Sequence, residues 1–184
     1  VYGESGDTFR FYEINPDVAE VSDQYFSYRS DSLADTDVVI GDARILLDRQ
    51  LAEGQSQRFD VLAVDAFSSD AIPIHLLTKE CGELYQQHLK DDGLLLIHIS
   101  NRYLDLNPVT RALAEHLGWK AVRIDSEEDD ATGVYDAEWI IITANEEFLS
   151  QSEVHNDHLP WDDDEPPPLL WTDDFAGLWQ VISW

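Results

Sequence analysis

The sequence contains no methionine, a single cysteine (Cys81), and only 11 lysines and arginines against 38 aspartates and glutamates. One cysteine excludes an internal disulfide and is typical of a reducing compartment. The net charge of −27 repels phosphate backbones and anionic lipid, which argues against nucleic acid as a partner. It favours cationic small molecules. Composition bias, such as adaptation to salt, explains most of this charge, so the acidity permits a cationic ligand without demonstrating one.

Long hydrophobic runs are also missing. No stretch approaches the roughly 20 apolar residues of a membrane span, and no signal peptide is visible. The chain begins with Val1 rather than methionine, which indicates a piece of a longer protein whose upstream part is open to a targeting or membrane segment. We therefore expect a cytoplasmic location, either free or as the cytoplasmic domain of a membrane protein.

Strand-like and helix-like segments alternate along the chain, and the hydrophobic content of 43% is typical of a folded domain. This alternation predicts an α/β fold with a mostly parallel, doubly wound sheet. The expected strands are 8–14, 38–41, 59–64, 93–99, 120–124 and 138–143, the last two forming an antiparallel return at the sheet edge. The expected helices are 16–26, 43–53, 74–89 and 107–117.

The character of the chain changes after Phe148. We expect residues 1–150 to form the α/β domain and residues 151–184 an acidic extension, rich in proline and tryptophan, that packs on it. Within the extension, 151–168 is predicted as a linker or extended wrap and 175–182 as a short helix. The six histidines show no metal-ligand spacing with Cys81, so no metal site is predicted.

Acidic residues follow three successive predicted strands: Glu13, Asp42 and Asp65. In open α/β sheets, ligands bind beyond the carboxyl ends of the strands, so we expect these side chains to converge on one pocket sized for an adenosyl group. One carboxylate there can accept both hydroxyl protons of a ribose, and another can accept the exocyclic amine of adenine. The alternative for Asp42 and Asp65 is capping of the helix that follows, and both interpretations stay open.

A second carboxylate, Asp70, follows Asp65 in a loop of small residues that Pro73 closes. A carboxylate pair in a partly dry cleft can hold a cation or take a proton from an amine. The pair could equally cap the next helix and its turn. The spacing alone does not decide between these interpretations.

Four segments carry a family resemblance: YEINP at 12–16, GDAR at 41–44, DVLAVDAFSSDAIPIHLL at 60–77 and LIHISNRYLDLNP at 96–108. They resemble the polyamine aminopropyltransferase (spermidine synthase) family, and most closely its spermidine-synthase-like branch, which is often fused to a membrane transporter-like region. The resemblance covers about residues 9–143, and TDDF at 172–175 fits the same branch. It implies a class I S-adenosylmethionine methyltransferase-like, Rossmann-like fold.

The resemblance also implies a reaction and roles for residues. Decarboxylated S-adenosylmethionine would donate an aminopropyl group to a small diamine or polyamine. Glu13 would hold the ribose hydroxyls and Asp42 with Ala43 the adenine, while Asp65 would deprotonate the attacking amine and Asp70 would bind the other end of the diamine. A methyltransferase using S-adenosylmethionine, and a non-catalytic domain that senses a nucleoside or polyamine, remain alternatives. Homodimer formation is left open.

The chain departs from the family at three points. In the family, a glycine-rich loop follows the first strand of the sheet. That loop is absent here, because both the strand and the loop should come before Gly3–Gly6. Without that strand, which lies mid-sheet, the sheet must close up, pair differently or borrow a strand, and this piece is expected to bind cofactor poorly or be inactive. The family's N-terminal β-domain is missing. The two acids are separated by AFSS, unlike the DxxDP-like spacing of true spermidine synthases.

Two further positions lie close to the predicted rim. His98 is expected to be a satisfied core residue of its strand rather than a functional one. Asn101 and Arg102 follow the same strand, and either contact the site or start a turn and pair with a surface acid.

Overall fold

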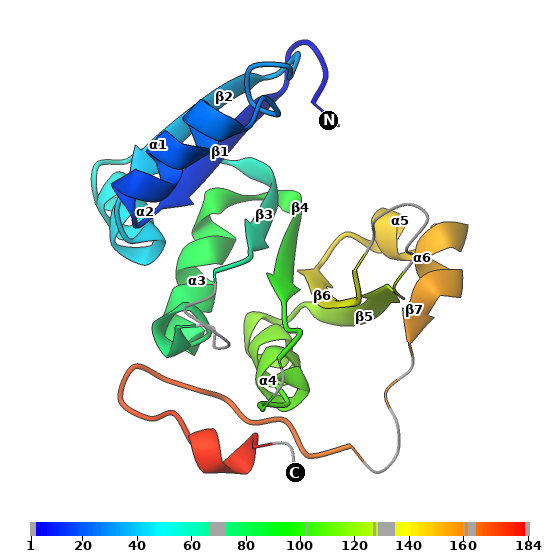
Figure 1. Ribbon diagram of the computed structural model, residues 1–184. Helices are drawn as coiled ribbons and strands as arrows, with labels where there is room; N and C mark the ends of the chain where they lie inside the picture. Colours follow the sequence, from blue (N-terminus) through cyan, green and yellow to red (C-terminus); the bar gives the residue numbers. More distant parts are fainter. Residues whose placement is uncertain are drawn as a thin grey trace. The chain divides into compact units, whose positions relative to one another are not determined.

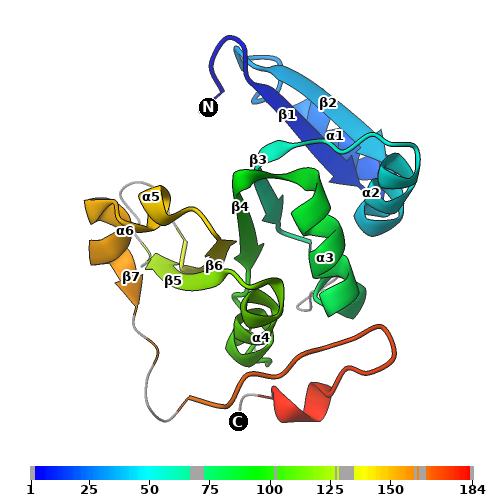
Figure 2. The same ribbon diagram turned by 180° about the vertical axis from the view of Figure 1, so that it is seen from behind.

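The computed structural model describes residues 3–66, 73–101, 103–126, 128, 135–159, 161 and 165–182. The chain divides into two compact units, residues 1–54 and residues 55–184. Both are α/β in character, and Figures 1 and 2 show their helices and strands from opposite sides.

The first unit is a βαβα arrangement of β1 (Thr8–Glu13), α1 (Pro16–Tyr25), β2 (Asp35–Ile40) and α2 (Ala43–Ala52). Its two strands are parallel, from Thr8 opposite Asp35 to Glu13 opposite Ile40, and α1 lies alongside them (Figure 1). Asn15 caps α1 by accepting a hydrogen bond from Asp17 N, and Pro16 occupies the first turn. The predicted start of this helix is confirmed.

The first unit buries little apolar surface. Among its described residues only Ala34 and Leu47 are fully buried hydrophobics. The Tyr12 hydroxyl donates to Gln50 Oε1 at 2.9 Å and ties β1 to α2. Burial raises the pKa of Tyr12 above its ordinary value, and the hydrogen bond to Gln50 and the nearby Arg10 partly offset that rise. Many large apolar side chains stay exposed, among them Ile14, Val18, Val21, Tyr25, Phe26, Leu33 and Ile45.

The second unit contains a five-stranded sheet in the order β3-β4-β6-β5-β7. Its strands are β3 (Phe59–Val64), β4 (Leu89–His98), β5 (Lys120–Ser126), β6 (Ala137–Thr143) and β7 (His158–Leu159). β3 and β4 are parallel, whereas the β4–β6, β6–β5 and β5–β7 pairs are antiparallel. The predicted antiparallel pairing of β5 with β6 is confirmed, but β7 rather than β5 lies at the edge of the sheet.

The expected single sheet is instead two sheets, with β1 and β3 each at an edge. Of the three outcomes left open for a sheet without its first strand, the described strands show the second, a pairing that differs from the doubly wound pattern. Residues 3–6 are part of a turn rather than of a glycine-rich ligand-binding loop. Asp7 N donates to Glu4 O at 3.1 Å, and Gly6 has φ of +104°.

Two main helices of the second unit, α3 (Lys79–His88) and α4 (Asn107–Leu117), pack against each other and against β4, β5 and β6. The core between them is apolar and fully buried; it includes Leu95, Ile97, Val109, Leu113, Ile140 and Ile142. Cys81 also lies in this core, as expected of a packing residue. α4 begins at Asn107 and ends before Gly118, which has φ of +68°, so both predicted ends are confirmed.

Three sequence-based expectations in this unit are wrong in detail. The helix expected over 74–89 is a 3₁₀ turn (η1, Ile74–Leu76) followed by α3, because Thr78 caps α3 through Cys81 N. The stretch 151–168 contains α6 (Ser152–Asp157) and β7, preceded by α5 (Glu146–Leu149). The helix expected over 175–182 is only a 3₁₀ turn, η2 (Leu178–Gln180).

Residues 165–182 run along α4 and α3 and are held by backbone hydrogen bonds (Figures 1 and 2). Leu169 N donates to Pro108 O and Lys79 N to Trp171 O, both at 2.9 Å. The Trp171 side chain is 1% exposed. This segment thus completes the core of the second unit rather than hanging from it.

Asp173 anchors this segment to the start of α3. Its Oδ1 accepts from Thr78 Oγ1 at 2.8 Å, and its backbone amide donates to Glu80 Oε2 at 3.0 Å. The same threonine caps α3. The helix start and the segment are therefore tied at one point.

A cluster of charged and aromatic side chains holds the beginning of the segment. Glu165, with its side chain 12% exposed, contacts Arg123 Nη1 at 2.7 Å and Arg111 Nη1 at 3.4 Å. Both guanidinium groups lie over the ring of Trp161, at 4.9 and 5.2 Å from its centroid. Cation–π contact and ion pairing together hold Trp161 and Glu165 against the two arginines.

In the described part of the chain, no helix is long and apolar enough to cross a membrane.

Candidate active site

Glu13 ends β1 and lies at the carboxyl edge of the first unit's sheet. Its carboxylate accepts from Asn15 N at 2.8 Å, and its carbonyl accepts from Gly41 N at 2.8 Å. The side chain is half-buried. These bonds fix the carboxylate at the strand end, where a parallel sheet presents its ligand site.

Asp42 lies at the same edge, two residues beyond Ile40, the register partner of Glu13. Its Oδ1 accepts from Ile45 N at 3.1 Å, so Asp42 is the N-cap of α2, and Ala43 is the first residue of that helix. The capping interpretation of Asp42 is therefore confirmed. Capping places Ala43 at a helix N-terminus. It does not test the adenine role of Asp42 and Ala43, which stays a prediction.

Gly41 connects β2 to Asp42 with φ of +140°, and a Cβ built there would meet Leu46 Cδ1 at 3.2 Å. We expect Gly41→Ala to destabilise the first unit by about 1–3 kcal/mol, because an L side chain is strained at this φ. Hydrogen exchange read by mass spectrometry, peptide by peptide, measures this: residues 35–52 should lose protection and residues 89–117 should not. Unchanged protection over 35–52 would contradict the expectation.

Asp65 directly follows β3, and its side chain is 57% exposed. The next helix among the described residues, η1, begins at Ile74 with Pro73 as its N-cap residue, so Asp65 does not cap that helix. The turn before it lies outside the described residues. Asp65 Oδ1 lies 2.8 Å from His98 Nδ1. Asp70 lies outside the described residues, so its role stays a prediction.

His98 is the residue that sequence reasoning missed. It ends β4 rather than lying mid-strand, and its side chain is 21% exposed. Its Nε2 lies 2.9 Å from Ser100 Oγ, and its ring stacks on Trp139 with centroids 4.7 Å apart and planes 16° apart. Both ring nitrogens have hydrogen-bond partners, as expected, but one partner is the candidate base Asp65 rather than a group in the core. The contact follows from strand register, because Val64 pairs with Ile97 and the next residues, Asp65 and His98, therefore lie side by side.

Asn101 supports the turn interpretation. Its Oδ1 accepts from Tyr103 N at 2.9 Å and from Leu104 N at 3.0 Å. Such Asx bonding starts a turn at the end of β4. Arg102 lies outside the described residues.

The candidate residues thus form two groups, Glu13 with Asp42 and Ala43 in the first unit, and Asp65 with His98 in the second. Within each group the structure brings the side chains to one strand edge. That the two groups share a pocket remains a prediction.

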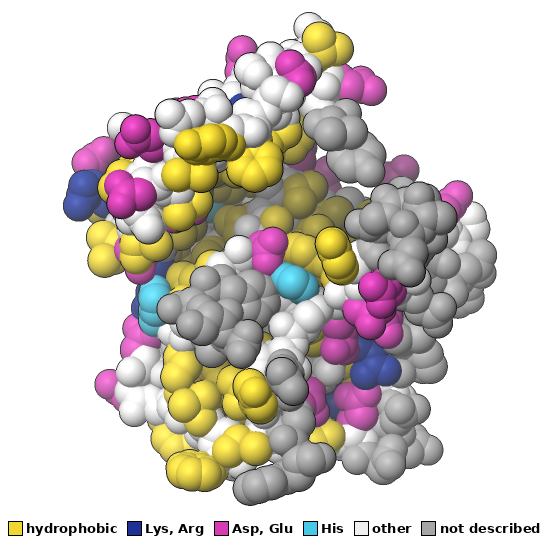
Figure 3. All heavy atoms as spheres, viewed as in Figure 1, with side chains coloured by type: hydrophobic (Ala, Val, Ile, Leu, Met, Phe, Trp, Pro, Cys, Tyr) yellow, Lys and Arg dark blue, Asp and Glu magenta, His cyan; other side chains and the backbone are white. Residues whose placement is uncertain are grey.

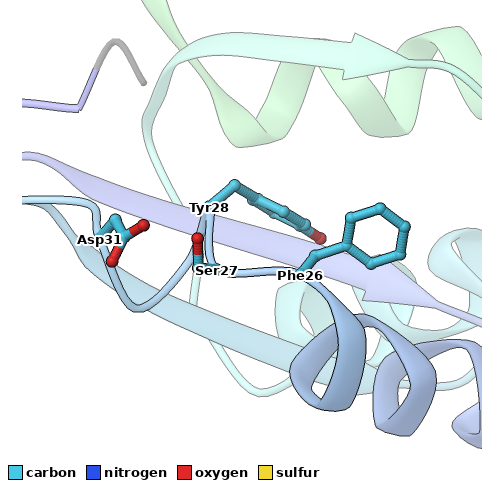
Figure 4. Close-up of a pocket in the computed structure, with 4 residues that line it drawn as sticks. All are labelled: Phe26, Ser27, Tyr28 and Asp31. Atoms are coloured by element: carbon cyan, nitrogen blue, oxygen red, sulfur yellow. The ribbon is translucent and has the colours of Figure 1, made fainter.

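A surface pocket lies elsewhere in the first unit, just beyond the end of α1 (Figure 4). It is lined by Phe26, Ser27, Tyr28 and Asp31, and none of the candidate residues contributes to it. The rings of Phe26 and Tyr28 lie edge to face, 6.4 Å apart. Its wall is open and mostly apolar, and we assign it no role.

Acidic side chains are spread over the face drawn in Figure 3, and lysine and arginine side chains are few there. The excess of 38 acidic over 11 basic residues accounts for this distribution. Such a surface attracts cations from solution and is screened by salt.

A comparison with protein-family models gave no match. Among curated proteins, the chain is 34% identical over 84 residues to the polyamine aminopropyltransferase of Vibrio vulnificus (strain CMCP6). The matched segment is 46% of this chain and 27% of that relative, so the activity of the whole enzyme does not transfer directly.

Solved structures show the same fold at low sequence identity. A probable spermidine synthase from Corynebacterium glutamicum ATCC 13032 matches 78% of this chain and 50% of its own with a TM-score of 0.52 and 17% identity. Human methyltransferase-like protein 13, in complex with SAH, matches 84% and 74% with a TM-score of 0.54 and 19% identity. A spermidine synthase in complex with the transition-state analogue AdoDATO matches 90% and 55% with a TM-score of 0.50 and 14% identity.

The fold is therefore of the class I methyltransferase-like type shared by these proteins, as the resemblance implied. Two of the matched proteins were solved with adenosyl ligands. These similarities show the fold and leave the activity, the substrate, the base and the cofactor form to be proposed.

Proposed function

We propose that this chain belongs to an aminopropyltransferase that moves the aminopropyl group of decarboxylated S-adenosylmethionine to a small diamine. The observation that carries the proposal is Asp65, a half-exposed carboxylate at the carboxyl end of a parallel strand, with one oxygen held by His98. The sequence similarity to a polyamine aminopropyltransferase supports it.

The chemistry requires a carboxylate of this kind. The amine nitrogen attacks the aminopropyl carbon bonded to the sulfonium sulfur, the new C–N bond forms as the C–S bond breaks, and the electron pair leaves with sulfur as a neutral thioether. The attacking nitrogen gains a positive charge and must lose a proton. Diamine nitrogens are mostly protonated near neutral pH, so a nearby carboxylate that takes a proton speeds attack by about 10²–10⁴-fold.

The other candidate residues take the roles that the resemblance implies. Glu13 holds the ribose hydroxyls, because its two oxygens match a vicinal diol. Asp42 and Ala43 hold the adenine, the carboxylate accepting from the exocyclic amine and the helix N-terminus offering a backbone amide to the ring. Asp70 binds the distal ammonium of the diamine.

The test is an assay of the purified protein at its full natural length with two donors, decarboxylated S-adenosylmethionine and S-adenosylmethionine, against a panel of diamines. Mass spectrometry of the products separates the reactions, because aminopropyl transfer and methyl transfer add different masses. We expect an aminopropylated diamine only with the decarboxylated donor. Methylated product would contradict the proposal in favour of a methyltransferase. Ligand binding without turnover would contradict it in favour of a sensor domain.

A further inference from the structure

Asp65, His98 and Ser100 form a hydrogen-bonded chain across the ends of β3 and β4. His98 Nδ1 is 2.8 Å from Asp65 Oδ1, and His98 Nε2 is 2.9 Å from Ser100 Oγ. Ser100 Oγ also accepts from Glu138 N at 2.7 Å. This series of hydrogen bonds therefore links the exposed carboxylate of Asp65 to the backbone of β6.

The donors and acceptors in this series of hydrogen bonds fit one tautomer of the His98 ring. An ionised carboxylate only accepts, so Nδ1 must carry a hydrogen and donate to Asp65. In the neutral ring Nε2 then accepts from the Ser100 hydroxyl. That hydroxyl has its own oxygen occupied by the Glu138 amide. The stacked Trp139 ring covers one face of the imidazole.

We propose that His98 is a positioning residue that holds Asp65 Oδ1 and so turns Oδ2 toward the amine of the diamine. This inference rests on the proposed function and adds a residue to it. Asp65 is on a strand end with its side chain 57% exposed, so without a partner its carboxylate would sample several rotamers. A fixed carboxylate loses less freedom in the transition state and keeps the proton acceptor in line with the attacking nitrogen.

Matched variants separate this role from a structural one. In His98→Asn the side-chain amide nitrogen occupies the place of Nδ1 and still donates to Asp65. In His98→Gln the amide lies at the place of Nε2, and in His98→Ala both donors are lost. We expect kcat to fall by about tenfold or more in the alanine and glutamine variants, with the KM of the adenosyl donor unchanged. The asparagine variant should recover most of this loss.

Equal losses in the asparagine and alanine variants would overturn the inference, as would full activity in the alanine variant. Thermal unfolding of all three variants, followed by circular dichroism, shows whether a variant has simply lost its fold.

An independent measurement keeps the inference testable if the chain does not turn over. ¹⁵N NMR of the histidine side chains distinguishes the Nδ1–H from the Nε2–H tautomer. We expect His98, assigned by its absence in His98→Asn, to be Nδ1–H in the neutral ring, and to lose that preference in Asp65→Ala. An Nε2–H tautomer in the native chain would overturn the inference. Absence of aminopropyl transfer together with an Nδ1–H signal would instead contradict only the proposed function.

Discussion

Replacing Asp65 with asparagine is expected to lower turnover by about a hundredfold or more while leaving nucleoside binding unchanged. Asparagine has nearly the shape of aspartate and can still accept from His98 Nδ1, so the local structure is kept. What it loses is the ability to take a proton from the attacking amine. Single-turnover kinetics with decarboxylated S-adenosylmethionine and a diamine measure the loss, and calorimetry with the nucleoside alone measures binding.

Asp60→Asn is the matched control for this variant. Asp60 lies on the same strand, with its side chain 78% exposed and ion-paired to Lys90. An exposed pair of this kind contributes about 0–1 kcal/mol, so its loss should leave turnover unchanged. Normal turnover in Asp65→Asn would remove Asp65 from the mechanism. An equal fall in both variants would assign the effect to strand β3 rather than to the base.

Replacing Trp171 with alanine is expected to destabilise the second unit by about 3–5 kcal/mol, which is the usual range for removing a buried tryptophan. The side chain is 1% exposed, and the Trp171 carbonyl accepts from Lys79 N at the start of α3. Its loss leaves a cavity beneath the docked C-terminal segment. Urea unfolding measures the change, because all six tryptophans of the chain lie in residues 55–184 and the remaining five still report on this unit by fluorescence.

Trp179→Ala is the internal control, since the same substitution is made eight positions further along the same segment. Trp179 is 84% exposed, and a surface change of this kind should alter the free energy of unfolding by less than about 0.5 kcal/mol. If both tryptophan variants unfolded at the same urea concentration as the native chain, residues 165–182 would not contribute to the stability of the second unit.

Local signals in the sequence located the elements well. Pro108 in the first turn and Gly118 with its positive φ mark the two ends of α4, because both signals depend on a few neighbouring residues. No side chain among the described residues caps the start of this helix. The start of α3 also has a local signal, the N-cap residue Thr78. The apolar pattern that continues back to Ile74 led us to place the start of the helix too early. The extent of β4 was underestimated, since it begins at Leu89 rather than Gly93.

Pairing between distant strands was harder to predict. The link between Asp65 and His98 depends on the register of β3 and β4, which are separated by a helix, and no local pattern sets that register. The conformation of the docked C-terminal segment was not predicted for a related reason. Its hydrogen bonds join residues about 60 to 95 positions apart, so its aromatic residues predicted burial but not the conformation.

The thin core of residues 1–54 bears on ligand affinity. A two-stranded sheet is marginal on its own, and this one has few buried apolar side chains among its described residues. If Glu13 and Asp42 hold a nucleoside, then only the folded fraction of this unit binds it, and the apparent dissociation constant rises in inverse proportion to that fraction. A substitution that strengthens α1 should consequently tighten nucleoside binding from a distance, without touching the ligand.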